Sequence, residues 1–214
     1  MKKLALTTAL ATVGLLSSPA WAESTFVPAA VVGSAAVARL DFSVVVPQVL
    51  FLRVGVSSGN TVTDPTINGL TFTTLAANIG NAVAVAGAGG DIAAGTVTVR
   101  VYGNGGNISL NSGTTGFLTN AAGNTIPWTQ IGVTGAALAA TTPGYTNASI
   151  VHPTFNATAG GGTGTATLLT AAARVVRVEG SWTYTYLNTN VVGAGTYGAT
   201  VPRNGRVTYT ATQL

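Results

Sequence analysis

The chain has 214 residues, of which 47% are hydrophobic and only 7% are charged, with 28 glycines, one histidine and no cysteine. This composition excludes a disulfide framework and the usual zinc sites. The formal charge of +4 falls to +2 when Lys2 and Lys3 are set aside, and the remaining basic residues are scattered arginines. Because nucleic-acid binding requires clustered basic residues, we expect no nucleic-acid partner.

Residues 1–22 have the pattern of a secretion signal. Lys2 and Lys3 supply a positive start, an apolar run extends to Leu16, and Ala20–Ala22 fits a small-x-small cleavage site. The run is shorter than the roughly 18 apolar residues that mark a spanning helix, and no later segment reaches that length. We therefore predict a signal peptide and secretion to the periplasm or cell surface of a Gram-negative-type bacterium, without a transmembrane helix.

Residues 23–39 are small and apolar at both odd and even positions, and the only charges are at the two ends. The apolar side chains of such a segment must be buried against another part of the protein or against a partner. It is either the first strand of the domain or an N-terminal arm that pairs with a neighbouring subunit. In the second case, the candidate subunit contacts are Phe26, Val27, Val31, Val32 and Val37.

The segment from Leu40 to Val56 is rich in β-branched residues and predicts strand structure. Pro47 divides it into two halves, because proline cannot donate a hydrogen bond to a β-ladder. We place the start of the folded domain at residue 40 and its end at residue 214.

Thr96 to Tyr102 alternates valine with polar residues, and Asn107 to Leu110 follows a glycine-rich link. Glycines between two short alternating runs are typical of a β-hairpin. We predict that these two runs pair with each other.

The clearest strand pattern is Val176 to Leu187, where valine, tryptophan and tyrosine occupy even positions and polar residues occupy odd positions. This period of two predicts a strand with one buried and one solvated face. Its length suggests a bend or bulge at Gly180. Glu179 should pair with a neighbouring arginine.

A final alternating segment, Gly205 to Gln213, predicts that a strand closes the domain. About eight to ten strands and no helix are expected in total. The fold class is therefore all-β, and we expect one immunoglobulin-like antiparallel β-sandwich without a disulfide.

Two strings resemble catalytic motifs but lack the context that the chemistry needs. Gly55–Gly59 fits G-x-S-x-G, yet no helix is predicted after it, and the only histidine is the distant His152. Gly193–Gly198 fits G-x-G-x-x-G, but Pro202 and a strand follow where a dinucleotide site requires a helix. We predict a turn and a loop, no catalytic residues and no enzymatic activity.

Asp64 and Asp91 lie in predicted loops and could join backbone carbonyls around calcium. No D-x-D-x-D grouping accompanies them. We therefore predict no metal site and no cofactor.

Four aromatic residues suggest either a sugar-stacking surface or a core. Aromatic residues that alternate with threonine along a strand belong more often to the core. The core interpretation is therefore favoured for Trp128, Trp182, Tyr184 and Tyr186.

The predicted signal, the apolar segment behind it, the β-rich body and the terminal strand together resemble secreted bacterial immunoglobulin-like subunits of the pilus and surface-fibre kind. The chain also looks like a group of uncharacterised secreted proteins with a W-T-Y-x-Y segment (Trp182–Tyr186), a G-T-Y loop (Gly195–Tyr197) and a terminal N-G-R-V-T-Y-T strand (Asn204–Thr210). The resemblance implies strand donation by the N-terminal arm to the next subunit. It also implies related subunits and a periplasmic chaperone as partners.

These observations favour a non-enzymatic structural or adhesive subunit of a surface fibre. A secreted carbohydrate-binding or ligand-binding module is the first alternative and requires exposed aromatic residues. A small outer-membrane β-barrel is the second alternative, because it shares the alternating strands and the signal peptide.

Overall fold

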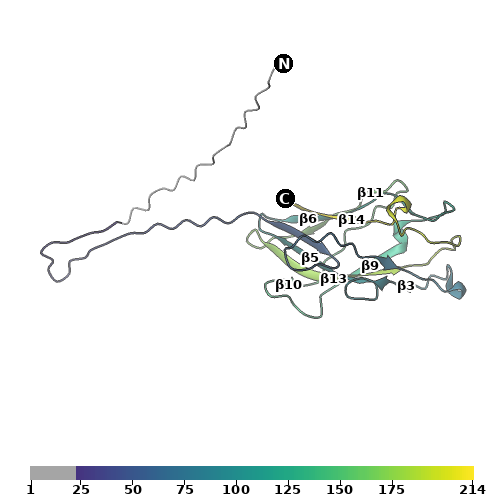
Figure 1. Ribbon diagram of the computed structural model, residues 1–214, viewed down its shortest axis with the longest axis horizontal. Coiled ribbons are helices and arrows are strands. Elements are labelled where there is room, and N and C mark those ends of the chain that lie inside the picture. The colour runs from purple at the N-terminus through teal and green to yellow at the C-terminus, as the bar shows by residue number, and fades with distance from the viewer. Residues whose placement is uncertain (1–22) are drawn as a thin grey trace, which may run out of the picture. The chain divides into compact units, whose positions relative to one another are not determined.

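The computed structural model describes residues 23–214, and the predicted signal peptide, residues 1–22, lies outside the described residues. Contacts between Cα atoms divide the chain into two units, with the boundary between Val46 and Pro47 (Figure 1). The first unit is described here over residues 23–46 and is called the arm. The second unit, residues 47–214, is called the body.

The body consists of strands joined by loops and turns, with three short 3-10 helices. The strands are β1 (Leu50–Val54), β2 (Leu70–Thr71), β3 (Val85–Ala86), β4 (Ala88–Gly89), β5 (Thr96–Gly103), β6 (Ile108–Thr114), β7 (Leu118–Thr119), β8 (Thr125–Ile126), β9 (Ile131–Ala136), β10 (Thr146–Asn147), β11 (Gly162–Thr163), β12 (Thr167–Leu169), β13 (Val176–Tyr186) and β14 (Thr208–Gln213). The 3-10 helices are η1 (Ala76–Asn78), η2 (Trp128–Gln130) and η3 (Val201–Arg203). The prediction of an all-β protein is confirmed.

The larger sheet has six strands and is organised around β13. On one side β13 pairs antiparallel with β5 over most of its length, and β1 pairs with the far side of β5. The short β3 pairs with the end of β13. On the opposite side, β13 pairs with β9 and, in parallel, with the two-residue β10.

The smaller sheet has four strands and is organised around β6. β14 pairs antiparallel with residues 108–113 of β6 on one side, and β12 and β11 pair with β6 on the other. Figure 1 shows the strands of the two sheets as two layers of the body. Two further sheets consist of the short pairs β2 with β4 and β7 with β8.

One hydrophobic core receives side chains from both of the larger sheets. Burial of these side chains is the main stabilising contribution in a body without disulfides. The buried members are Val97, Val99 and Val101 of β5, Ile108 and Leu110 of β6, Ile150, and Val176, Trp182 and Tyr184 of β13.

The predicted alternation of β13 is confirmed on its even face but not on its odd face. The even-numbered residues of β13 are buried or half-buried, as expected. The odd face was expected to be solvated, yet Glu179 is fully buried and Ser181 is nearly so. A loop residue, Thr142, binds Glu179 over this part of the sheet, and Ser181 donates a hydrogen bond to the carbonyl of Ala136 on the neighbouring strand β9.

The predicted bulge at Gly180 is not present. The register between β13 and β5 runs without interruption from Val176 opposite Gly103 to Thr183 opposite Thr96. A Cβ atom at residue 180 would instead lie 2.3 Å from the carbonyl oxygen of Ala148. The glycine is required by this close approach, at the place where the neighbour of β13 changes from β10 to β9.

The predicted hairpin between residues 96–102 and 107–110 is wrong. β5 pairs with β1 and β13, whereas the next strand, β6, belongs to the other sheet. The glycine-rich link therefore carries the chain from one sheet to the other. Both strands alternate in burial because each has one face on the same core.

The segment from Leu40 to Val56 forms a strand only after Pro47. β1 covers Leu50–Val54, and residues 40–49 have no assigned strand structure. The body therefore begins at Pro47, later than residue 40, where we expected the domain to start.

Candidate functional site

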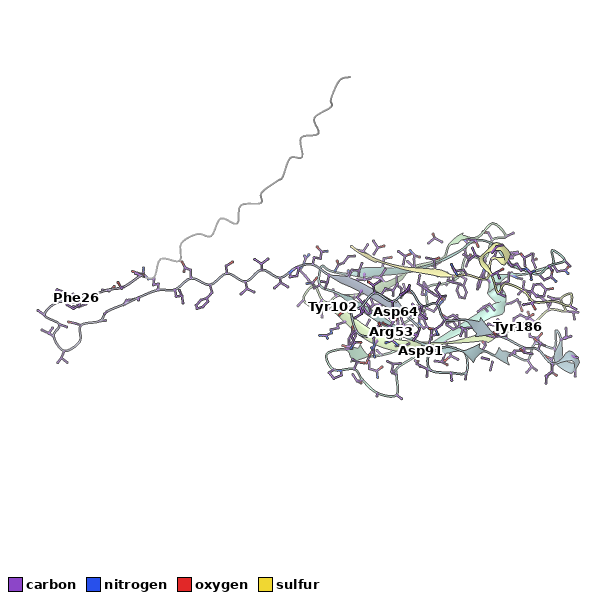
Figure 2. The ribbon with its side chains drawn as sticks, viewed as in Figure 1. Phe26, Arg53, Asp64, Asp91, Tyr102 and Tyr186 are labelled. Carbon is purple, nitrogen blue, oxygen red and sulfur yellow. The ribbon has the colours of Figure 1, made fainter. Side chains whose placement is uncertain are left out.

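The arm exposes its apolar side chains. Every residue from 23 to 46 is exposed except Val27, which is intermediate. The exposed fraction reaches 88% for Phe26, whose position is labelled in Figure 2, and 85% for Phe42. The candidate contacts predicted from the sequence lie in the first part of this arm, and none of them belongs to the core cluster of the body.

Residues 23–39 contact one another around a turn. The Ser34 amide donates to the Val31 carbonyl (2.9 Å), and the Thr25 hydroxyl donates to the Val37 carbonyl (2.6 Å). Arg39 and Glu23 form an exposed ion pair at 3.6 Å. This part of the arm therefore folds back on itself.

Residues 40–46 follow this turn and differ from it in pattern. Their sequence, L-D-F-S-V-V-V, contains neither glycine nor proline and places Leu40, Phe42, Val44 and Val46 at alternate positions. All seven positions are exposed and carry no strand assignment. The segment has the composition of a strand without a described partner strand.

One edge of the larger sheet is open at β1. β1 lies at the end of the strand order and pairs with β5 alone among the described strands. The amide of Gly55 donates to the carbonyl of Thr98 (2.7 Å). In this antiparallel register, the odd-numbered residues of β1 are therefore the ones whose backbone groups bond to β5. The backbone groups of Leu50, Leu52 and Val54 therefore point away from β5.

A groove of about 590 Å³ follows this edge. β1 forms one wall, and the loop of residues 56–66 contributes the other side, including Val56 and Val62. Leu50, Val56 and Val62 are between 37% and 49% exposed, so the groove offers apolar surface to solvent. Arg53, Asp64 and Tyr102 also line it, and Figure 2 shows these three side chains near one another.

The loop wall of the groove is held by Asp64. Its carboxylate accepts hydrogen bonds from the Thr66 amide (2.9 Å) and the Ser58 amide (2.8 Å). These bonds lower the pKa of Asp64 to about 2, with Thr66 as the larger contributor. The carboxylate is therefore ionised and fixes the loop across the physiological pH range.

On the strand wall, Arg53 of β1 is fixed by Asp91. The guanidinium lies 3.0 Å from the carboxylate and also donates to the carbonyl of Gly55 (2.6 Å). The second carboxylate oxygen of Asp91 accepts from the amide of Thr98 (2.8 Å). These bonds connect β1, β5 and the loop before β5, so they position the edge strand.

A buried ion pair lies on the same face of the larger sheet. Arg100 Nε donates to Glu179 Oε2 at 2.7 Å, and Glu179 is fully buried. The guanidinium also donates to Asn60, in the groove loop, and to Thr142. Arg100 therefore fixes two loops over the sheet, and the predicted pairing of Glu179 with an arginine is confirmed.

The environment of Glu179 keeps this carboxylate ionised. Burial favours the neutral acid, but hydrogen bonds from Thr142 and Arg100 and the charge of Arg100 outweigh it. The net effect lowers the pKa of Glu179 below its ordinary value. Arg100 and Thr142 of the same chain therefore balance the buried charge of Glu179 and satisfy its hydrogen bonds.

A second groove, of about 570 Å³, lies between β9 and residues 149–155. Trp128, His152 and Phe155 contribute aromatic lining, and the rings of Trp128 and Phe155 pack at a tilt of 41° with centroids 5.0 Å apart. Trp128 is 94% buried, so little of its ring faces this groove. Close packing occurs at one end, where a Cβ atom on Gly135 would lie 2.6 Å from the carbonyl oxygen of Ile150.

The single histidine takes part in an interior hydrogen-bond chain. His152 Nε2 lies 2.7 Å from the Tyr209 hydroxyl, which lies 2.8 Å from the Tyr184 hydroxyl. Burial lowers the pKa of His152 to about 4 and raises the pKa of both tyrosines. The chain is therefore uncharged near neutral pH and links β14 to β13.

The four aromatic residues considered for sugar stacking are buried, as the favoured interpretation expected. Trp182 is fully buried, and its indole N–H donates to the carbonyl of Ile150 (2.8 Å). The other members are at most 8% exposed: Trp128, Tyr184 and Tyr186.

The two motif-like strings adopt turn and loop structure. In Gly55–Gly59 the Ser57 hydroxyl donates to the carbonyl of Gly59 (2.8 Å), and no helix occurs in the residues that follow, up to Gly69. Gly193–Gly198 has no helical residue either, and η3 after it has only three residues. Neither segment provides the helix N-terminus that its motif requires.

Asp64 and Asp91 bind separate backbone amides rather than a common site. Within residues 23–214, no group of three or more histidine, cysteine, aspartate or glutamate side chains is arranged to hold a metal ion. In the same part of the chain, no helix has the length and apolar character needed to cross a membrane.

Comparison with known proteins gives no match: no family model, no curated protein and no solved structure is significantly similar to this chain. The two unusual features of the chain are the exposed apolar arm and the open, grooved edge at β1.

Proposed function

We propose that the chain is a secreted, non-enzymatic structural or adhesive subunit of a bacterial surface fibre. Copies associate when the arm of one copy adds as a strand to the body of the next. This mode of association supplies main-chain hydrogen bonds and pockets for alternate side chains.

The observation that carries the proposal is the exposure of the arm. Large side chains such as Phe42, Val44 and Val45 are each at least 85% exposed. Exposed contiguous apolar surface is rare in soluble proteins that act alone and marks interaction sites. An extended apolar segment gains most from a partner that also satisfies its backbone.

The body supports the same function. Two mainly antiparallel sheets enclose one core, and we propose that they form an immunoglobulin-like sandwich. Its scarcity of charge leaves few of the lysine and glutamate side chains that protect sheet edges. The burial of Trp182 and Tyr184 supports this function over carbohydrate binding, which needs exposed aromatic rings.

The test compares residues 23–214 with a matched variant in which Phe42, Val44 and Val46 are replaced by serine. Light scattering after size-exclusion chromatography and electron microscopy are performed over a range of concentrations. We expect concentration-dependent oligomers or filaments from the native sequence and monomers from the variant. Monomers from both proteins at every concentration would overturn the proposal, and equal association of both would exclude residues 40–46 as the contact.

A further inference from the structure

We propose that residues 40–46 are the donated segment and that the open edge of β1 in a second copy is its acceptor. This inference rests on the proposed function and assigns the two surfaces that meet. Within the arm, it assigns donation to residues 40–46, which the sequence predicted to lie in the folded domain, rather than to residues 23–39.

The donor assignment follows from pattern and from internal contacts. Residues 23–39 contain Pro28 and the turn around Gly33, and they bond to one another across that turn. Residues 40–46 have no such interruption. Their apolar side chains alternate, so Leu40, Phe42, Val44 and Val46 would share one face of an added strand.

The dimensions of donor and acceptor agree. At about 3.3 Å per residue, residues 40–46 would extend over roughly 23 Å, and the five residues of β1 over roughly 17 Å. The donor therefore covers the whole of the acceptor strand. One further residue at each end is left to join the flanking chain.

The acceptor offers both of the interactions that an added strand requires. The backbone groups of Leu50, Leu52 and Val54 point away from β5, toward the place of a further strand. Leu50, Val56 and Val62 leave apolar surface exposed in the adjacent groove. An added strand would form hydrogen bonds with these backbone groups of β1 and would cover the apolar surface of the groove.

The other edges of the two sheets fit less well. At β9, a Cβ atom on Gly135 would lie 2.6 Å from the carbonyl oxygen of Ile150, so another segment already packs closely against this strand. On β14 the exposed side chains are Thr208, Thr210 and Thr212, which present hydroxyl groups to an incoming strand. Among these three edges, the one at β1 combines an apolar groove with backbone groups that extend along a whole strand.

The two surfaces are different parts of the chain, so their contact is heterologous. Each copy carries one donor and one acceptor, and both remain available at the ends of a growing assembly. Such contacts generate a ring when the rotation closes and a filament when it does not. This geometry agrees with the fibre subunit proposed above.

The absence of cysteine from the native sequence permits a direct test by disulfide trapping. Phe42→Cys is introduced in one preparation of residues 23–214 and Val62→Cys in another. The two are mixed under mild oxidation, and the linked peptides are identified by mass spectrometry. Phe42 is exposed and Val62 is 49% exposed, so neither replacement disturbs the core.

The matched control mixes the Phe42→Cys protein with a Val151→Cys protein, in which residue 151 lines the second groove and is 68% exposed. We expect the 42–62 linkage at least ten times more often than the 42–151 linkage. A dominant 42–151 linkage, or equal yields, would overturn the acceptor assignment.

Association of the unmodified protein is measured in parallel and separates this inference from the proposed function. Oligomers without the 42–62 linkage would reject the β1 edge while retaining a self-associating subunit. Monomers at every concentration would reject both. A synthetic peptide with the sequence of residues 40–46 should shorten the oligomers that residues 23–214 form, and oligomers of unchanged length would also count against the assignment.

Discussion

Arg100 Nε lies 2.7 Å from the fully buried carboxylate of Glu179, and this pair fixes loops from two distant parts of the chain. Replacing Glu179 with glutamine should lower the free energy of unfolding by about 3–5 kcal/mol, because it leaves a guanidinium without its counter-ion. Urea unfolding followed by the fluorescence of the buried Trp182 measures the change.

The exposed pair of Glu23 and Arg39 supplies the control. Glu23→Gln should leave the unfolding midpoint unchanged, because exposed ion pairs contribute little to stability. Equal midpoints for the Glu179→Gln protein and the native protein would show that the buried pair has no net stabilising role.

His152 should make stability depend on pH between about 6.5 and about 4. Burial lowers its pKa to about 4 from 6.5, so the unfolded chain binds a proton in this interval while the folded chain does not. Stability should therefore rise with pH across the window and fall on acidification, by up to about 3 kcal/mol. The measurement is urea unfolding at a series of pH values.

His152→Gln provides the comparison for this pH dependence, because glutamine does not titrate. The slope above about pH 5, where carboxylates no longer titrate, should disappear in the variant, and an unchanged slope there would assign it to another group. The lowered pKa of Glu179 acts separately: its contribution is present above the ordinary value of 4.5 and is lost as the pH falls through the folded value.

Gly180→Ala should be strongly destabilising although it adds only one methyl group. The new Cβ would lie 2.3 Å from the carbonyl oxygen of Ala148 and 2.9 Å from that of Ala136, so backbone must move. We expect a loss of about 1–3 kcal/mol in thermal or urea unfolding. Gly160→Ala is the control, because a Cβ atom there has no neighbour within 4 Å. Similar stability of the two variants would contradict the close packing at residue 180.

Removal of the arm should leave the stability of the body unchanged. The core cluster contains residues of the body only, and residues 40–46 are exposed. Residues 47–214 should therefore unfold cooperatively with a free energy within about 0.5 kcal/mol of the longer chain, measured on monomers at low concentration. A large loss of stability would show that the arm completes the fold of its own body.

Local pattern predicted the parts of the fold that depend on a few neighbouring residues. The period of two in Val176–Leu187 predicted β13 and its buried even face, and the alternation after Gly205 predicted β14. The burial of Trp182 and the pairing of Glu179 with an arginine were also predicted. Each depends on one strand and its immediate neighbours, which the sequence pattern describes directly.

The local sequence pattern does not predict which strands pair over long distances in the sequence. The alternation of β5 and β6 is the same whether they form a hairpin or face each other across a core, so only the tertiary structure places them in different sheets. The burial of Glu179 likewise depends on Thr142, 37 residues away in the sequence.

The amino-acid sequence specifies an all-β chain without disulfides whose apolar residues follow strand periodicity, because these properties are local or compositional. Contacts between distant segments explain why one apolar strand pattern becomes a paired strand and another receives no strand assignment. Residues 40–46 and β1 have similar composition, but β1 pairs with β5 whereas residues 40–46 have no assigned partner. That difference arises from contacts between distant segments, and it produces both the donor and the acceptor proposed here.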